Sequence, residues 1–272
     1  MAPGYSFHDD EEKAAFCKRM AKIQLHEALC DVKIKCQSFE MAAHRNVLAA
    51  QSDWFLKAFT NGFVETGANE IILQEDEPSV IEALVHFCYN FDYCDTGEKC
   101  SSGLAGGGGP MAFNVHVFAA AEKYLIEPLQ RFALNRLRYH SRINFNAEDF
   151  AKAIEHAYTA TSDPKSLLRR MIIKISFDEM DHLFSTNGRH KSAVFDAVAD
   201  RVPSYAADLM RAAQRTGRLG EECRQMLCPT EGCYSNVYYD VDSNGRVAGY
   251  CEECKKHHLG NAEQFGVVVY PE

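Results

Sequence analysis

The sequence lacks the features that mark membrane proteins, secreted proteins and the common classes of enzyme. No run approaches the ~20 apolar residues of a membrane-spanning helix, so no membrane partner is expected. The first residues are acidic and carry no apolar stretch, so we expect no secretory signal and an intracellular location, in the cytoplasm or the nucleus. Glycine-rich nucleotide fingerprints, a nucleophile elbow and an HExxH motif are absent as well. These absences predict a protein that is not an enzyme.

Basic residues are also in short supply. The chain has 29 lysines and arginines against 38 acidic residues, which gives a net charge of −9, and no segment forms a basic patch. Because binding to nucleic acids depends largely on neutralising phosphates, this balance predicts that neither DNA nor RNA is a partner.

What is present fits a protein that mixes helices with a few short strands. The 272 residues, 46% of them hydrophobic, are enough for one large domain or for two to three small ones. Residues 31–36 alternate between apolar and polar, and Phe39 and Met41 continue the alternation after a turn, which predicts a hairpin. Helical periodicity follows, with a break at 51–53 that indicates two short helices capped by Ser52 or Asp53.

Glycine is concentrated in one place. Residues 95–112 include four consecutive glycines, which disfavour a regular element and predict a flexible insertion. Helices are expected at 114–126 and 128–140, and then through most of the chain to about residue 215. One of these begins at a capping box, Asn146-Ala-Glu-Asp149.

A series of motifs, in order along the chain, resembles a BTB/POZ domain. These motifs are Cys30-Asp31-Val32, Ala43–Ser52, Trp54-Phe55, Phe63-Val64-Glu65, Glu70–Leu73, Phe87-Cys88-Tyr89, Val117–Ile126 and Pro128–Leu137. The resemblance implies an α+β fold, the BTB/POZ fold of short strands and a helical bundle, over residues 25–139 with 95–112 as the insertion.

The rest of the chain flanks that domain. We predict an N-terminal helical segment over 1–24, a helical extension over 140–227, a small module over 228–258 and a tail over 259–272. The helical extension, which includes Ser204–Met210, resembles the BTB proteins of filamentous fungi.

The resemblance implies a module that binds other proteins. BTB domains form homodimers, and many bind a cullin as substrate adaptors of ubiquitin ligases. Their cullin-contact signature, an apolar residue, any residue and then Glu, is matched by Phe63, Val64 and Glu65. The alternative for Phe63 is packing in its own core. The alternative function is a nuclear scaffold or co-regulator of transcription that does not bind DNA itself.

Two charged residues match the charged pocket of the family, Asp31 and Arg45. In transcriptional BTB domains these positions line a groove of the dimer, and the alternative is an ion pair that joins strand to helix. His44 is interpreted as a buried, hydrogen-bonded histidine, because no second metal ligand lies near it in sequence.

Cysteine is abundant, with 11 residues, and four of them are grouped. Cys228 and Cys233 are followed, after seventeen residues, by Cys251 and Cys254, and the segment between the pairs reads as a β-hairpin. Paired cysteines that a hairpin brings together are typical of a structural zinc site, so we predict one Zn²⁺ per chain in a zinc-ribbon-like module. His257 or His258 is an alternative fourth ligand. Unliganded thiols or disulfides are the other reading.

Overall fold

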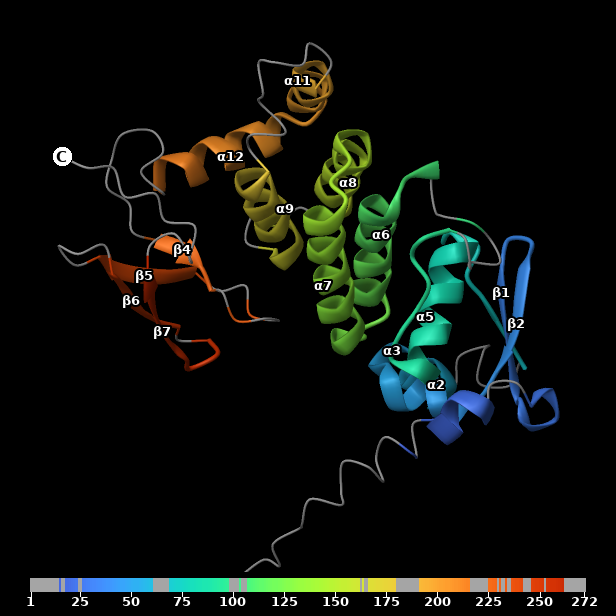
Figure 1. Ribbon diagram of the computed structural model, residues 1–272. Helices are drawn as coiled ribbons and strands as arrows, with labels where there is room; N and C mark the ends of the chain where they lie inside the picture. Colours follow the sequence, from blue (N-terminus) through green and yellow to red (C-terminus); the bar gives the residue numbers. More distant parts are fainter. Residues whose placement is uncertain are drawn as a thin grey trace, which may run out of the picture. The chain divides into compact units, whose positions relative to one another are not determined.

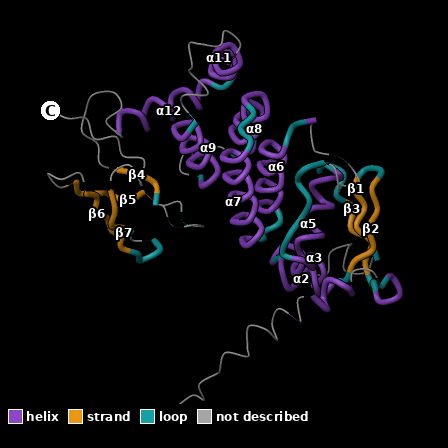
Figure 2. Tube along the Cα trace, viewed as in Figure 1, coloured by secondary structure: helices purple, strands orange, loops and turns teal. Residues whose placement is uncertain are grey.

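The computed structural model of the chain divides into two compact units, Met1–Gln130 and Arg131–Glu272 (Figure 1). Strands occur in both units (Figure 2). The structure describes residues 15, 18–23, 26–60, 69–97, 103, 107–161, 163, 166–179, 191–215, 225–228, 230, 233, 236–241, 246–251 and 253–261. Within the N-terminal segment, residues 18–23 are helical.

The first unit contains a three-stranded sheet in the order β2-β1-β3. Strand β1 (Val32–Cys36) pairs antiparallel with β2 (Phe39–Ala43) and parallel with β3 (Glu70–Ile72). Gln37 adopts a positive φ of 52° in the turn between β1 and β2. Three residues of β1 that alternate along the strand are buried: Val32, Ile34 and Cys36. The hairpin predicted from this alternation is confirmed.

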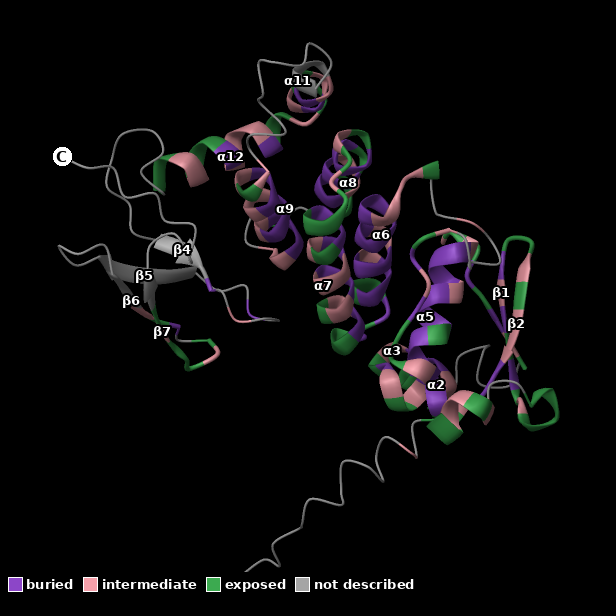
Figure 3. Cartoon of the chain, viewed as in Figure 1, coloured by how far each residue is buried: buried purple, intermediate pink, exposed green. Residues whose placement is uncertain are grey.

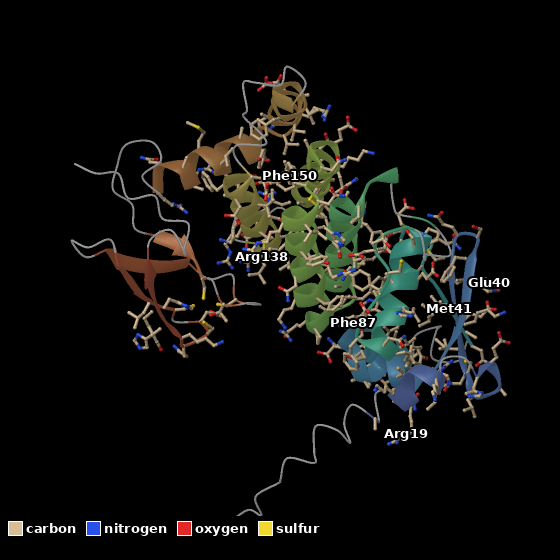
Figure 4. The ribbon with its side chains drawn as sticks, viewed as in Figure 1. Arg19, Glu40, Met41, Phe87, Arg138 and Phe150 are labelled. Atoms are coloured by element: carbon tan, nitrogen blue, oxygen red, sulfur yellow. The ribbon has the colours of Figure 1, made fainter. Side chains whose placement is uncertain are left out.

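The first unit also contains helices. They are η1 (Glu27–Leu29), α2 (Arg45–Gln51), α3 (Asp53–Thr60), α5 (Pro78–Asn90) and α6 (Pro110–Lys123). The predicted break between α2 and α3 is confirmed, and Ser52 is the cap, since its Oγ accepts the Phe55 N–H at 3.0 Å. Buried residues run along α5 and α6 (Figure 3). Phe87 lies on α5 (Figure 4), and its ring centroid is 5.8 Å from that of Phe91.

Helix α6 begins four residues before the predicted start at residue 114. It takes in Pro110, Met111 and Ala112, which the sequence assigned to the end of the insertion. The physical reason is that Pro110 occupies the first turn, where its missing N–H is not needed, and that Met111 and Ala112 are buried.

Tyr124, just after α6, joins several parts of the first unit. Its backbone carbonyl accepts the Ser52 hydroxyl at 2.6 Å, and its ring stacks on Phe55 with centroids 5.8 Å apart. The ring of Trp54 meets it edge-on at 5.0 Å. The Tyr124 hydroxyl donates to Asp76 Oδ2 at 2.7 Å. Burial and this hydrogen bond raise the pKa of Tyr124 far above its ordinary value, so the donor is neutral.

Asp76 also accepts hydrogen bonds from Lys123, Cys36 and Gln37. Its carboxylate accepts two bonds from Lys123 Nζ, at 2.9 and 3.0 Å. Its backbone carbonyl accepts Cys36 Sγ at 3.1 Å and Gln37 Nε2 at 3.0 Å. The loop after β3 is therefore tied both to the β1–β2 turn and to the end of α6.

In the second unit, the described residues up to 215 are mostly helical. Its helices are α7 (Glu127–Ile143), which begins at the end of the first unit, then α8 (Ala147–Ala160), α9 (Leu167–Asp178), α11 (Lys191–Arg201) and α12 (Pro203–Arg215). Asn146 caps α8 by accepting the Asp149 N–H at 2.9 Å, as predicted. In the part of the chain described, no helix is both long enough and apolar enough to cross a membrane.

Tyr205 of α12 is the centre of this helical extension. The side chain is fully buried, and its hydroxyl lies 2.7 Å from Ser176 Oγ on α9. Its ring meets Tyr158 of α8 at 5.6 Å and Phe195 of α11 at 5.9 Å. One aromatic residue thus contacts three other helices.

A four-stranded antiparallel sheet, in the order β4-β5-β6-β7, ends the described chain. Its strands are β4 (Gln225–Leu227), β5 (Asn236–Val241), β6 (Arg246–Tyr250) and β7 (His257–Asn261). The predicted hairpin between the two cysteine pairs is β5–β6, which confirms that part of the interpretation. Strand β7 runs to Asn261, past residue 258.

The link between Tyr124 and Asp76 gives the first prediction. The substitution Tyr124→Phe removes a hydrogen bond to a mostly buried carboxylate, and such bonds contribute about 1.5–3 kcal/mol. We therefore expect the free energy of unfolding of the first unit to fall by about 2 kcal/mol. Urea titration followed by the fluorescence of Trp54, the one tryptophan of the chain, measures this. Tyr139→Phe, at a ring that is 51% exposed, is the control. Equal midpoints for the two variants would contradict the role of Tyr124.

Candidate metal centre and interaction surface

The four grouped cysteines come together in the second unit. Cys228 follows β4, Cys251 follows β6, and Cys254 precedes β7, while Cys233 lies between β4 and β5. Their four sulfur atoms all lie within 4.8 Å of one another. Cys228 Sγ is 3.6 Å from Cys254 Sγ, and Cys233 Sγ is 3.5 Å from Cys251 Sγ. Cysteines that are far apart in sequence thus form one cluster that is able to bind a metal.

The spacing of the sulfurs suits a tetrahedral metal ion. Four Zn–S bonds of about 2.3 Å place the sulfurs of a regular tetrahedron about 3.8 Å apart. The Cys228–Cys254 and Cys233–Cys251 separations of 3.6 and 3.5 Å lie close to that value, and Cys228, Cys233 and Cys251 are buried. Four thiolates would fill the coordination sphere of such an ion and leave no position for a reactive water, as in structural zinc sites.

Two turns of the backbone hold the thiols in place. The N–H of Cys233 donates to the carbonyl of Thr230, and the N–H of Cys251 donates to the carbonyl of Lys256, both at 3.0 Å. Lys255, directly after Cys254, adopts a left-handed φ of 57°, which closes the second turn. The cysteines therefore lie in tight, hydrogen-bonded turns at the ends of strands.

Hydrogen bonds also favour the thiolate form of Cys254. Desolvation alone would raise the pKa of Cys254. Hydrogen bonds from the Thr230 hydroxyl and the backbone N–H of Lys256 outweigh it and lower this pKa to about 6. Desolvation raises the pKa of Cys228 above its ordinary value, although hydrogen bonds from Thr230 act in the opposite direction. Thr230 thus contacts sulfurs of both pairs. No sequence motif marks Thr230, because its role depends on how the first turn is folded.

The two neighbouring histidines differ in position. His258 Nε2 lies 3.2 Å from Cys228 Sγ. His257 instead places its ring against Tyr250, with centroids 4.7 Å apart, and is exposed. His258 is thus the histidine that the fold brings to the cysteines.

Asp31 and Arg45 meet where β1 and α2 begin. Asp31 Oδ1 accepts the backbone N–H of Arg45 at 2.8 Å, so the carboxylate caps the first turn of α2. The Arg45 Nε donates to the carbonyl of Asp31 at 3.4 Å, and its guanidinium lies 5.2 Å from the ring centre of Phe59. A role of this pair in a partner groove stays a prediction.

His44 is buried and hydrogen-bonded, as the sequence predicted. Its backbone N–H donates to the hydroxyl of Tyr89 at 2.8 Å, and its Nδ1 lies 2.8 Å from the same oxygen. Its Nε2 lies 3.9 Å from Cys30 Sγ.

The predicted cullin-contact residues Phe63, Val64 and Glu65 lie outside the described residues. Helix α3, which precedes them, ends at Thr60, and its Phe55 is fully buried. The helix that leads into this segment is therefore anchored in the core of the first unit.

Comparison with known proteins identifies the family of the domain in the N-terminal half of the chain. The family model of the BTB/POZ domain matches residues 20–141. Kelch-like protein 7 of Homo sapiens is 30% identical over 125 residues, which cover 46% of this chain and 19% of that protein. Kelch-like protein 3 of Bos taurus is 23% identical over 262 residues, covering 93% of this chain and 43% of that protein. This chain therefore spans less than half the length of these relatives.

A solved structure, the BTB domain of zebrafish PATZ1, is similar to this chain with a TM-score of 0.38 and 17% identity, covering 50% of this chain and 99% of the other. The family match coincides with the β2-β1-β3 sheet and with helices α2 to α7. The predicted α+β fold is confirmed, and the domain boundaries at 24, 139, 227 and 258 and the fungal resemblance stay predictions. Residues 20–141 of this chain are a BTB/POZ domain.

Proposed function

We propose that this chain is a non-enzymatic adaptor that links a target protein to a cullin-based ubiquitin ligase. The observation that carries the proposal is the BTB/POZ domain itself, a domain that binds other proteins. Two Kelch-like proteins, which are longer chains, are similar to this chain over 125 and 262 residues. An intracellular location, in the cytoplasm or the nucleus, belongs to this proposal.

The segment that would contact the cullin is Phe63-Val64-Glu65. It follows α3, whose N-terminus is fixed by the Ser52 cap and whose Phe55 stacks on Tyr124. The helix that precedes this segment is thus anchored, and a specific interface needs a rigid support of this kind. In this proposal Phe63 fills an apolar cleft of the cullin, and Glu65 orders the backbone of the segment.

In this proposal the helical extension and the C-terminal sheet bind the target protein. We propose that Cys228, Cys233, Cys251 and Cys254 hold one structural Zn²⁺, which stabilises the sheet of short strands around them. The support is the close spacing of four sulfurs contributed by two separate inter-strand segments, β4–β5 and β6–β7. A closed site of this kind supplies stability and a rigid surface rather than chemistry.

Removal of the Phe63 side chain tests the cullin contact. Anchoring aromatics commonly contribute ~2 kcal/mol or more to binding, so Phe63→Ala should weaken the affinity for a cullin N-terminal region about 30-fold. The free energy of unfolding should stay unchanged, since the side chain is proposed to be outside the core. Titration calorimetry and urea unfolding of the full chain measure the two quantities.

Phe91→Ala, at an aromatic residue that is 44% exposed on the same domain, is the matched control and should bind normally. If Phe63→Ala instead loses ~3 kcal/mol or more of stability, Phe63 belongs to the core. An unmodified chain that fails to bind any cullin would favour the alternative, a nuclear scaffold of transcription.

Loss of one cysteine tests the metal. Purified chain should contain one zinc, and Cys251→Ser should release it and make residues 228–258 sensitive to protease, because the strands lose their common anchor. Cys94→Ser, at a cysteine outside the cluster, should keep the zinc. Elemental analysis and limited proteolysis check both results, and a metal-free chain with a resistant C-terminal sheet would disprove the site.

A homodimer is the third part of the proposal. The N-terminal helical segment, residues 1–24, carries apolar residues at helical spacing, and BTB domains commonly dimerise. Light scattering at micromolar concentration should give the mass of a dimer, and removal of 1–24 should shift the mass toward that of the monomer. A full-length chain that stays monomeric would contradict this interface.

A further inference from the structure

We propose that four thiolates alone hold the ion and that His258 stands outside the coordination sphere, where its Nε2–H donates to Cys228 Sγ and tightens metal binding. This inference rests on the zinc site proposed above and assigns to His258 the role of a positioning residue. It separates two arrangements, four sulfurs or three sulfurs and one nitrogen, that the sequence leaves open.

The register of β7 explains why His258 rather than His257 reaches the cysteines. His258 pairs with Gly249 and His257 pairs with Tyr250 of β6. Successive side chains of a strand point to opposite faces of the sheet, so only one of the two histidines faces the cluster. His257 is on the Tyr250 side, and His258, half-buried, is on the side of Cys228.

The geometry fits a hydrogen bond to a bound thiolate. The Nε2–Sγ separation of 3.2 Å is within the range of N–H···S contacts. Among the residues described, the group whose ligand atoms all lie within 4.8 Å of one another consists of the four cysteines, and His258 is not a member. Since four sulfurs complete a tetrahedron, His258 would bind the ion only by displacing one of them.

The net negative charge of the proposed site explains why a hydrogen-bond donor beside a sulfur would strengthen metal binding. A divalent zinc with four thiolates carries a net charge of −2, and donors around the sulfurs offset it. Thr230 Oγ1 lies 3.6 Å from Cys254 Sγ, and His258 supplies a second side-chain contact, at Cys228. Both side chains therefore approach Cys228, and Thr230 reaches Cys254 as well.

Cobalt titration of the full chain tests the inference, because the intensity of the sulfur-to-cobalt charge-transfer bands reports the number of bound thiolates. We expect a four-thiolate spectrum for the unmodified chain and for His258→Ala. The affinity of His258→Ala should fall about 10-fold, the usual effect of removing an outer partner of a metal ligand. His258→Gln keeps an N–H donor and should recover part of that loss, and His257→Ala should bind as the unmodified chain does.

Two results would overturn the inference. A spectrum with three thiolates in the unmodified chain, altered by His258→Ala, would make His258 a ligand. Equal affinities for the unmodified chain, His258→Ala and His258→Gln would leave His258 without a role. If His258→Ala does not fold, the spectrum and affinity of His258→Gln decide in the same way. Failure of the unmodified chain to bind either cobalt or zinc is a different outcome, which rejects the metal site itself and His258 with it.

Discussion

The hydrogen bond between the Tyr124 hydroxyl and the Asp76 carboxylate is the interaction on which the BTB/POZ domain depends most. At 2.7 Å it joins the end of α6 to the loop that follows β3. The same tyrosine accepts the hydroxyl of Ser52, which caps α3, and the same aspartate holds the β1–β2 turn through Cys36 and Gln37. The sheet, the short helices and the long helix α6 are thus joined by one partly buried set of hydrogen bonds.

The C-terminal sheet depends on a different constraint. Its strands are three to six residues long, and isolated sheets of that size bury little apolar surface. The cysteines lie at strand ends and in turns, so a bound ion would tie together β4, β6 and β7. The helical extension contains a buried aromatic cluster around Tyr205, whereas the sheet that follows it in the sequence would be stabilised by the proposed metal ion.

Local patterns in the sequence predicted much of this structure. Alternation gave β1 and β2, a capping box gave the start of α8, and the spacing of cysteines gave the cluster and the β5–β6 hairpin. The predicted start of α6 was wrong, because the four glycines suggested a loop as far as residue 112. In the structure Pro110 begins the helix and Met111 is buried.

Contacts between residues that are far apart in the chain, or that depend on strand register, could not be predicted from local sequence patterns. Tyr124 lies 48 residues from Asp76 and 72 from Ser52, so no periodicity connects them. His257 and His258 are adjacent and chemically identical, and only the register of β7 on β6 separates them. Thr230 reaches Cys254 across the hairpin, so its role becomes visible only when both turns are folded.

Native mass spectrometry of the full chain mixed with a cullin N-terminal region tests the adaptor function most directly, because one spectrum reports partner, stoichiometry and metal together. The account predicts an assembly of two chains and two cullin regions that carries one zinc per chain. A spectrum that contains only the separate chain and the separate cullin region, under conditions in which the chain keeps its fold, would contradict it.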